Sequence, residues 1–214
     1  MGAQTVWNAP GVKERLTSLA SSHEHDHVFG ANGHHFLVGR PLSSQQVEGF
    51  ETEWGFQLPG DYRLFLTAVG NGGAGPGYGL FPLGMADDIG DDMKPWDDFL
   101  VGRPGSQFPH ERAWNLPLDQ LQPPDELGQE QLDAWFEHHD TEYFDPRLVD
   151  GAIPIAHFGC AIRIYLVVTG PLAGQVWTDD RAGDQGIYPC EPVQFTHWYL
   201  RWLEEAERHL GADS

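Results

Sequence analysis

Apolar side chains recur at helical spacing in several parts of this chain. In residues 60–69, Tyr62, Phe65, Leu66 and Val69 stand at positions i, i+3, i+4 and i+7. This spacing places all of them on one side of an α-helix. It therefore predicts a helix over residues 60–69 with one buried face.

Two further segments have the same periodicity. Residues 43–54 begin with Ser43 and Gln46, which have the spacing of a capping box at a helix start. The segment 194–209 has the richest apolar face, formed by Phe195, Trp198, Tyr199, Trp202, Leu203, Ala206 and Leu210. We expect this face to lie in the core and Trp202 to be a buried indole. A stripe before residue 20 and the segment 129–139 indicate two more helices.

The last third of the chain alternates between apolar and other residues. Ile162, Ile164, Leu166 and Val168 share one face of an extended segment. The pattern predicts strands at about 78–82, 152–156, 161–169 and 174–178. With the helices, these strands predict an α+β fold, a single domain with a central mixed, largely antiparallel sheet packed against helices.

The chain has no visible internal repeat. We expect an N-terminal helix and His-rich segment over residues 1–36, followed by a single α+β domain over residues 37–210. Residues 84 to about 128 are rich in Asp, Pro and Gly, and they predict an irregular acidic excursion within this domain.

Charge narrows the choice of partners. The 214 residues contain 12 Lys and Arg against 32 Asp and Glu, for a formal net charge of −20. Such a chain repels nucleic acid phosphates and anionic membranes and attracts cationic proteins. We expect no nucleic acid partner and no membrane partner, and the sequence leaves the oligomeric state open.

The N-terminal residues lack a basic region followed by an apolar one, so they do not predict a secretory signal. The longest apolar run, around residues 161–168, is interrupted by Arg163 and is far too short to span a membrane. Cys160 and Cys190 lack the spacing of a metal or redox motif. We therefore expect a cytoplasmic protein with reduced thiols.

A glycine-rich stretch, VGNGGAGPGYGLFPL at residues 69–83, contains the G-x-G-x-x-G spacing of dinucleotide-binding proteins. That motif has meaning only between a strand and the helix that it opens. Here the predicted order is helix first and strand second, and Pro76 opposes an immediate helix. We therefore interpret the stretch as a turn that requires positive φ angles, and expect no nucleotide cofactor.

Residues His23, Glu24 and His27 form a literal H-E-x-x-H, the pattern of zinc hydrolases. Zinc chemistry requires this pentad inside a helix, and the following Phe29 and Gly30 make helical continuity doubtful. The alternative, polar residues in solvent, is favoured. The Asp-rich stretch from residue 87 to 98 lacks the Gly and Glu positions of an EF-hand loop. We expect no catalytic residues, no metal site and no cofactor.

The segment FETEWGFQLPGDYRLFLTAVGNGGAGPGYGLFPL at 50–83 resembles the signature of the SUKH superfamily, the Smi-one/Knr-four cell-wall-regulator family. The segments IPIAHFGCAIRIYLVV, GQVW and FTHWYLRWL are similar to that family's second half. The resemblance runs from about Leu37 to Leu210, except for the acidic excursion. It implies an α+β fold without catalytic residues.

For bacterial members, the resemblance implies immunity proteins that bind and neutralise toxins, often nucleases, of polymorphic toxin systems. For the fungal branch it implies a regulatory interaction protein. The sequence therefore leaves three hypotheses: an immunity protein, a regulatory or scaffold protein, and a metal-dependent hydrolase using His23, Glu24 and His27.

The leading hypothesis names a basic protein toxin as the partner, because nucleases carry clustered Lys and Arg to hold a phosphate backbone. Candidate contacts fall in two places. The candidate partner-binding residues are Asp87, Asp88, Asp91, Asp92, Trp96, Tyr78 and Phe81. The carboxylates would attract the toxin, Trp96 would serve as an apolar anchor, and Tyr78 and Phe81 would line a surface groove.

Overall fold

The computed structural model describes residues 8–22, 27–87, 93–96, 101–124 and 126–211. The helical elements are α1 (Ala9–Ala20), α2 (Ala31–His34), α3 (Ser44–Trp54), α4 (Gly60–Ala68), α6 (Leu118–Leu121), α7 (Gln129–Tyr143), η2 (Pro146–Val149), η3 (Arg181–Gly183) and α8 (Phe195–Gly211). The strands are β1 (Met85–Asp87), β2 (Met93–Pro95), β3 (Ala152–Gly159), β4 (Ile162–Val167), β5 (Gln175–Asp180) and β6 (Gly186–Gln194). Within these segments, no helix combines the length and apolarity needed to cross a membrane.

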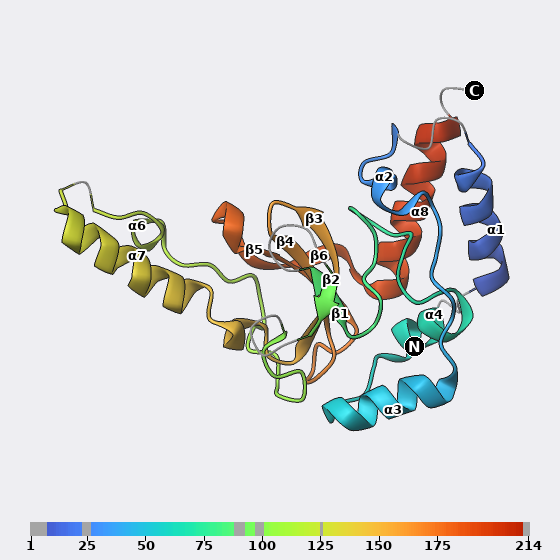
Figure 1. Cartoon of the computed structure of the whole chain (residues 1–214), viewed down its shortest axis with the longest axis horizontal. Coiled ribbons are helices and arrows are strands. Elements are labelled where there is room, and N and C mark those ends of the chain that lie inside the picture. The colour runs from blue at the N-terminus through green and yellow to red at the C-terminus, as the bar shows by residue number, and fades with distance from the viewer. Residues whose placement is uncertain (1–7, 23–26, 88–92, 97–100, 125, 212–214) are drawn as a thin grey trace.

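The centre of the molecule is a four-stranded antiparallel sheet in the order β3-β4-β5-β6 (Figure 1). Alternate residues of β4 face opposite sides because successive side chains of a strand point in opposite directions. Ile164 and Leu166 join the larger apolar cluster with the helices, whereas Tyr165 and Val167 join a second cluster on the other face. The predicted α+β fold with helices packed on a sheet is confirmed.

The second face is covered by the acidic excursion. Phe108 packs edge-to-face against Trp177 of β5 with ring centroids 5.0 Å apart. Trp114 pairs with Ile187 of β6 through backbone hydrogen bonds of 2.8 Å in both directions. The excursion therefore contributes apolar cover to the sheet, which its composition did not indicate.

Helix α8 contributes three buried aromatic side chains, Phe195, Trp198 and Tyr199, to the larger apolar cluster. Phe195 and Tyr199 are fully buried, and Tyr199 packs against Phe65 of α4 with ring centroids 4.9 Å apart. The Tyr199 hydroxyl donates to the Ala74 carbonyl oxygen at 2.9 Å. The predicted helices over 43–54, 60–69 and 194–209 are found as α3, α4 and α8.

Helices α3 and α8 start with side-chain caps of different origin. Ser43 and Gln46 form the predicted capping box of α3. At the start of α8, the amide and the hydroxyl of Thr196 both donate to Asp61 Oδ2, at 3.2 and 3.1 Å. A carboxylate at this position satisfies free amide groups and stabilises the positive end of the helix dipole. Asp61 therefore joins α4 to α8.

Three sequence expectations need correction. Residues 78–82 form no strand; Leu80 makes only isolated antiparallel bridges to Gly73 and Ala156. We expected a mixed sheet, but every strand pairing among the described residues is antiparallel. Trp202 is only partly buried, because its indole also lines a surface cavity.

The glycine-rich stretch follows α4 and leads into extended chain, and no helix begins within it. Gly73 has a φ of +93°, and a Cβ there would lie 2.3 Å from the Leu37 carbonyl oxygen. Gly77 has a φ of +63°, and its Cβ would lie 2.3 Å from the His157 carbonyl oxygen. Both the backbone angle and the close approach therefore require glycine, as the interpretation of a structural turn predicted.

Candidate protein-interaction surfaces

The predicted acidic contact lies around the β1–β2 hairpin. Asp87 ends β1 and pairs with Met93 of β2. Asp88, Asp91 and Asp92 lie outside the described residues, so the structure does not place their carboxylates. Their role as partner contacts stays a prediction.

Trp96 follows β2 and lies in the core. Its side chain is 8% exposed, and its ring stands edge-on to Phe50 and Trp54 with centroids 5.3 Å away in both cases. The indole Nε1–H donates to the Met85 carbonyl oxygen at 3.0 Å. In this conformation Trp96 anchors the hairpin to α3 and presents little surface to a partner.

Tyr78 and Phe81 do not share a groove. Phe81 is 3% exposed and stacks on His157 with ring centroids 5.4 Å apart. Tyr78 is 37% exposed and stacks on the same imidazole with ring centroids 5.2 Å apart. Phe29, 61% exposed, lies 5.5 Å from the Tyr78 ring. In this region, Tyr78 and Phe29 are therefore the neighbouring aromatic residues that solvent can reach.

A cavity of about 330 Å³ opens beside this pair. Its lining includes Phe29, Gly77, Phe158, Trp198, Trp202, Arg201, Glu191 and Glu205. Phe29 precedes α2, and the other residues come from the glycine-rich turn, from β3 and from the consecutive elements β6 and α8. The cavity therefore joins parts of the chain that are far apart in the sequence. No local pattern linked Phe29 to α8, so sequence reasoning missed this surface.

A second site lies where α7 meets the sheet, and a buried ion pair holds it in place. Arg181 is 6% exposed, and its Nε and Nη2 donate to the two carboxylate oxygens of Asp179 at 2.8 and 2.6 Å. Nη1 donates to the carbonyl oxygen of Tyr143, the last residue of α7, at 2.8 Å. Burial alone would lower the Arg181 pKa, but the hydrogen bonds and charge of Asp179 outweigh burial and raise it.

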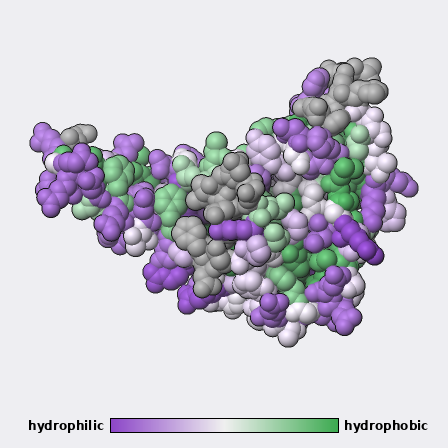
Figure 2. Space-filling view, viewed as in Figure 1, coloured by the Kyte–Doolittle hydropathy of each residue, from purple (hydrophilic) through white to green (hydrophobic). Residues whose placement is uncertain are grey.

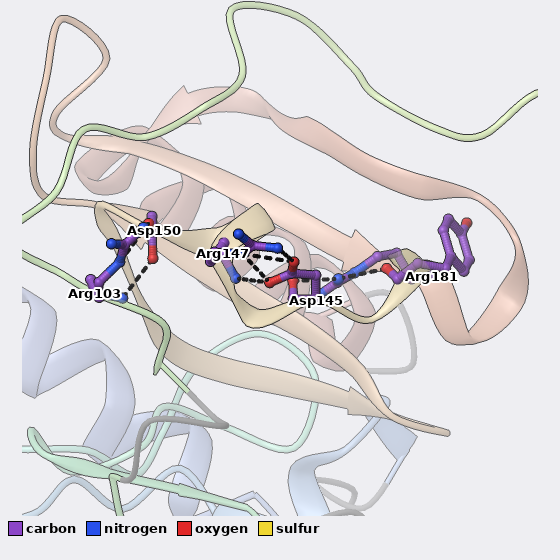
Figure 3. Close-up of polar contacts among 6 residues, drawn as sticks. Arg103, Asp145, Arg147, Asp150 and Arg181 are labelled. Atoms are coloured by element: carbon purple, nitrogen blue, oxygen red, sulfur yellow. Dashed lines mark hydrogen bonds and ion pairs between the residues drawn. The ribbon is translucent and has the colours of Figure 1, made fainter. Parts of the chain in front are cut away.

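Two more arginine–aspartate pairs continue from this point along η2 (Figure 3). Arg147 binds Asp145 through Nε at 2.8 and 3.0 Å and through Nη2. Asp150, largely buried, accepts from the Arg103 backbone amide at 2.8 Å and from its Nη2 at 2.6 Å. These contacts fix the segment after α7 to the acidic excursion and to the sheet.

A cavity of about 480 Å³ lies at this junction. Its lining comprises Asp140, Thr141, Phe144, Asp145, Pro146, Val149, Ala161, Arg163, Tyr165, Asp179, Arg181 and Ala182. Asp179 already pairs with Arg181, and Asp145 with Arg147. The volume lies in the range of about 300–1,000 Å³ that ligand pockets have, and the lining mixes apolar and charged side chains.

Neither histidines nor cysteines assemble into a metal site in the segments that the structure describes, where no group of three or more His, Cys, Asp or Glu side chains has suitable geometry. His23 and Glu24 lie outside those segments, and His27 is exposed. Cys160 and Cys190 are free thiols, and burial raises the pKa of Cys190 to about 11. A thiol with that pKa is a poor nucleophile near neutral pH.

Comparison with known proteins gives one result that bears on identity. Residues 41–186 match the sequence model of the SMI1 / KNR4 family (SUKH-1). The matched range contains α3, α4, the glycine-rich turn, the acidic excursion and strands β3 to β5. No curated protein and no solved structure gave a match. The fold, with helices packed on an antiparallel sheet, and this match over most of the chain show that it belongs to the SMI1 / KNR4 family (SUKH-1).

Proposed function

We propose that this chain is an immunity protein that binds and neutralises a toxin, a nuclease domain of a bacterial polymorphic toxin system. The observation that carries the proposal is the family match over residues 41–186. Family membership supports a role in protein interaction, and members are generally non-catalytic immunity or regulator proteins.

Charge supports a basic toxin as the partner. A nuclease domain must gather Lys and Arg at its substrate groove to hold phosphates. A blocking protein gains from presenting carboxylates to the same cations, since complementary charge raises the association rate and disfavours other partners. The net charge of −20 makes this chain suited to that task.

The proposal predicts that a toxin gene lies immediately upstream of the gene for this chain, and the test uses the toxin domain that this upstream gene encodes. Its nuclease activity is measured while the purified chain is added. We expect activity to fall to the background level at one equivalent of chain, with a complex of both proteins recovered by size-exclusion chromatography. Unchanged activity at several equivalents, together with the absence of a complex, would contradict the proposal and favour the regulatory alternative.

A further inference from the structure

Helix α7 projects away from the body of the protein. In Figure 1 it forms an arm together with α6 and approaches the sheet only with its C-terminal end. Tyr143, at that end, is the single residue of α7 that is buried. Figure 2 shows this arm as a mainly hydrophilic protrusion with apolar patches. A helix of 15 residues with so little contact to a core leaves most of its surface open to a partner.

The apolar and aromatic side chains of α7 differ in exposure. Leu132, Trp135 and His139 are half-buried, with the Trp135 and His139 rings stacked at 4.8 Å. Phe136 follows Trp135, with ring centroids 5.2 Å apart, yet it is 47% exposed. Phe144, directly after the C-terminal end of α7, is 37% exposed. Exposed phenylalanines two turns apart form an apolar stripe that can anchor a partner.

Carboxylates surround this stripe without any basic residue nearby in the sequence. Helix α7 carries Glu130, Asp133, Glu137, Asp140 and Glu142, and the chain has no Lys or Arg between Arg112 and Arg147. In the part of the chain that the structure describes, Gln129 donates to Asp133, His138 lies beside Glu142, and His139 lies beside Asp140. The stripe is therefore flanked by carboxylates along α7, and at its Phe144 end the Arg181 guanidinium, paired with Asp179, lies 5.7 Å from the ring centroid.

The stripe ends at the 480 Å³ cavity. The lining of that cavity includes Asp140 and Thr141 of α7 and Phe144, the residue that follows the helix. The Arg181–Asp179 ion pair and the hydrogen bond from Arg181 to the end of α7 fix the cavity and the helix relative to each other. A partner that lies along α7 can therefore place one side chain in a cavity that is already formed.

We propose that the α7 face, defined by Asp133, Phe136, Glu137, Asp140 and Phe144 with the adjoining cavity, is the docking surface for a basic protein. This inference rests on the proposed function only for the identity of that protein. Apolar side chains of the partner pack on Phe136 and Phe144, and its lysines or arginines face the carboxylates at the rim. Sequence reasoning placed the contact in the Asp-rich loop instead, because the loop has the densest carboxylates.

The experiment compares two triple variants that change charge equally. The test variant is Phe136→Ser, Glu137→Gln and Asp140→Asn. The matched control is Leu64→Ser, Glu14→Gln and Glu53→Gln, which alters one exposed apolar residue and two exposed carboxylates away from α7. Both lose the same two formal charges, so a general effect of net charge acts on both equally.

Two probes are titrated against each full-length chain at about 0.1 M salt. One is a fluorescent amphipathic helical peptide with arginine on one side and leucine on the other, followed by anisotropy. The other is the toxin domain encoded upstream. We expect the test variant to raise the Kd for both by about tenfold or more, because it removes an anchor and two rim charges. The control should change Kd by less than about twofold.

Equal Kd values for the two variants with the peptide would overturn the inference. If the toxin domain binds the unaltered chain and the test variant with equal affinity, the docking surface is wrong while the proposed function stands. If the toxin domain does not bind at all but the peptide distinguishes the variants, the proposed function fails and the surface stands.

Discussion

Helices α8 and α7 use aromatic side chains in opposite ways. In α8, Phe195 and Tyr199 are fully buried. In α7, Phe136 is 47% exposed, although both helices carry aromatic and acidic residues. Burial therefore separates aromatics that stabilise the fold from those that remain available for contact. The comparison associates stability with the α8 core, and the docking surface proposed above associates recognition with the α7 arm.

The largest effect is expected from truncating the α8 core. Tyr199→Ala should lower the free energy of unfolding by about 4 kcal/mol, because it leaves a large cavity and removes the hydrogen bond to Ala74. Urea denaturation measures this change. Phe136→Ala, the matched change on α7, should stay within about 0.5 kcal/mol of the unaltered chain. Equal decreases in the free energy of unfolding for the two variants would contradict the assignment of stability to the α8 core.

The second effect depends on pH and arises at His34. Its Nδ1 accepts from the Phe36 amide at 3.0 Å, and burial lowers the pKa from 6.5 to about 4. The unfolded chain therefore takes up the proton first. The contribution of neutral His34 is present above about pH 6.5 and is lost as pH falls towards 4, by up to about 3 kcal/mol.

Denaturation curves at several pH values between 4 and 7 test the role of His34. His34→Asn keeps an acceptor and cannot titrate in this range, so its stability should fall less steeply on acidification than that of the unaltered chain. Parallel slopes for the two proteins would show that His34 is not the responsible group.

A smaller effect is expected at the start of α8. Asp61→Ala removes the acceptor for the amide and hydroxyl of Thr196 and should cost about 1 kcal/mol. Glu53→Ala is the control, because it removes one exposed carboxylate near the C-terminal end of α3, where a carboxylate does not cap a helix. Thermal melting of both variants measures the difference, and equal melting temperatures would argue against the cap.

The smallest effect is expected from the Asp-rich stretch at residues 87–92. Replacing Asp87, Asp88, Asp91 and Asp92 by Asn should slow association with the toxin several-fold at low salt and leave the melting temperature nearly unchanged. Stopped-flow mixing across about 0.05 to 0.5 M salt measures this. Rates that respond to neither the substitutions nor the salt would leave the loop without a role in electrostatic attraction.

Local periodicity was sufficient to predict most helices and three strands. It failed for β6, because Pro189 and Pro192 argue against a strand. The strand lies at the edge of the sheet, where a missing amide donor is tolerated. It also failed at residues 78–82, where Gly77 and Gly79 with positive φ angles interrupt the extended chain.

The candidate sites depended more on tertiary structure. Trp96 looked like an exposed anchor in an acidic loop, but Phe50 and Trp54 of a distant helix cover it. The segment 129–139 was recognised as helical, yet only the fold shows that α7 extends away from the core. The family resemblance predicted from residues 50–83 is confirmed by the match over residues 41–186.

Hydrogen–deuterium exchange of the chain with and without the upstream-encoded toxin domain tests the division of roles most directly. The account predicts that the toxin slows exchange in α7 and in the segment 140–149 that lines its cavity, with little change in α8. Protection confined to α8 and the cavity beside Tyr78, with α7 unaffected, would contradict it.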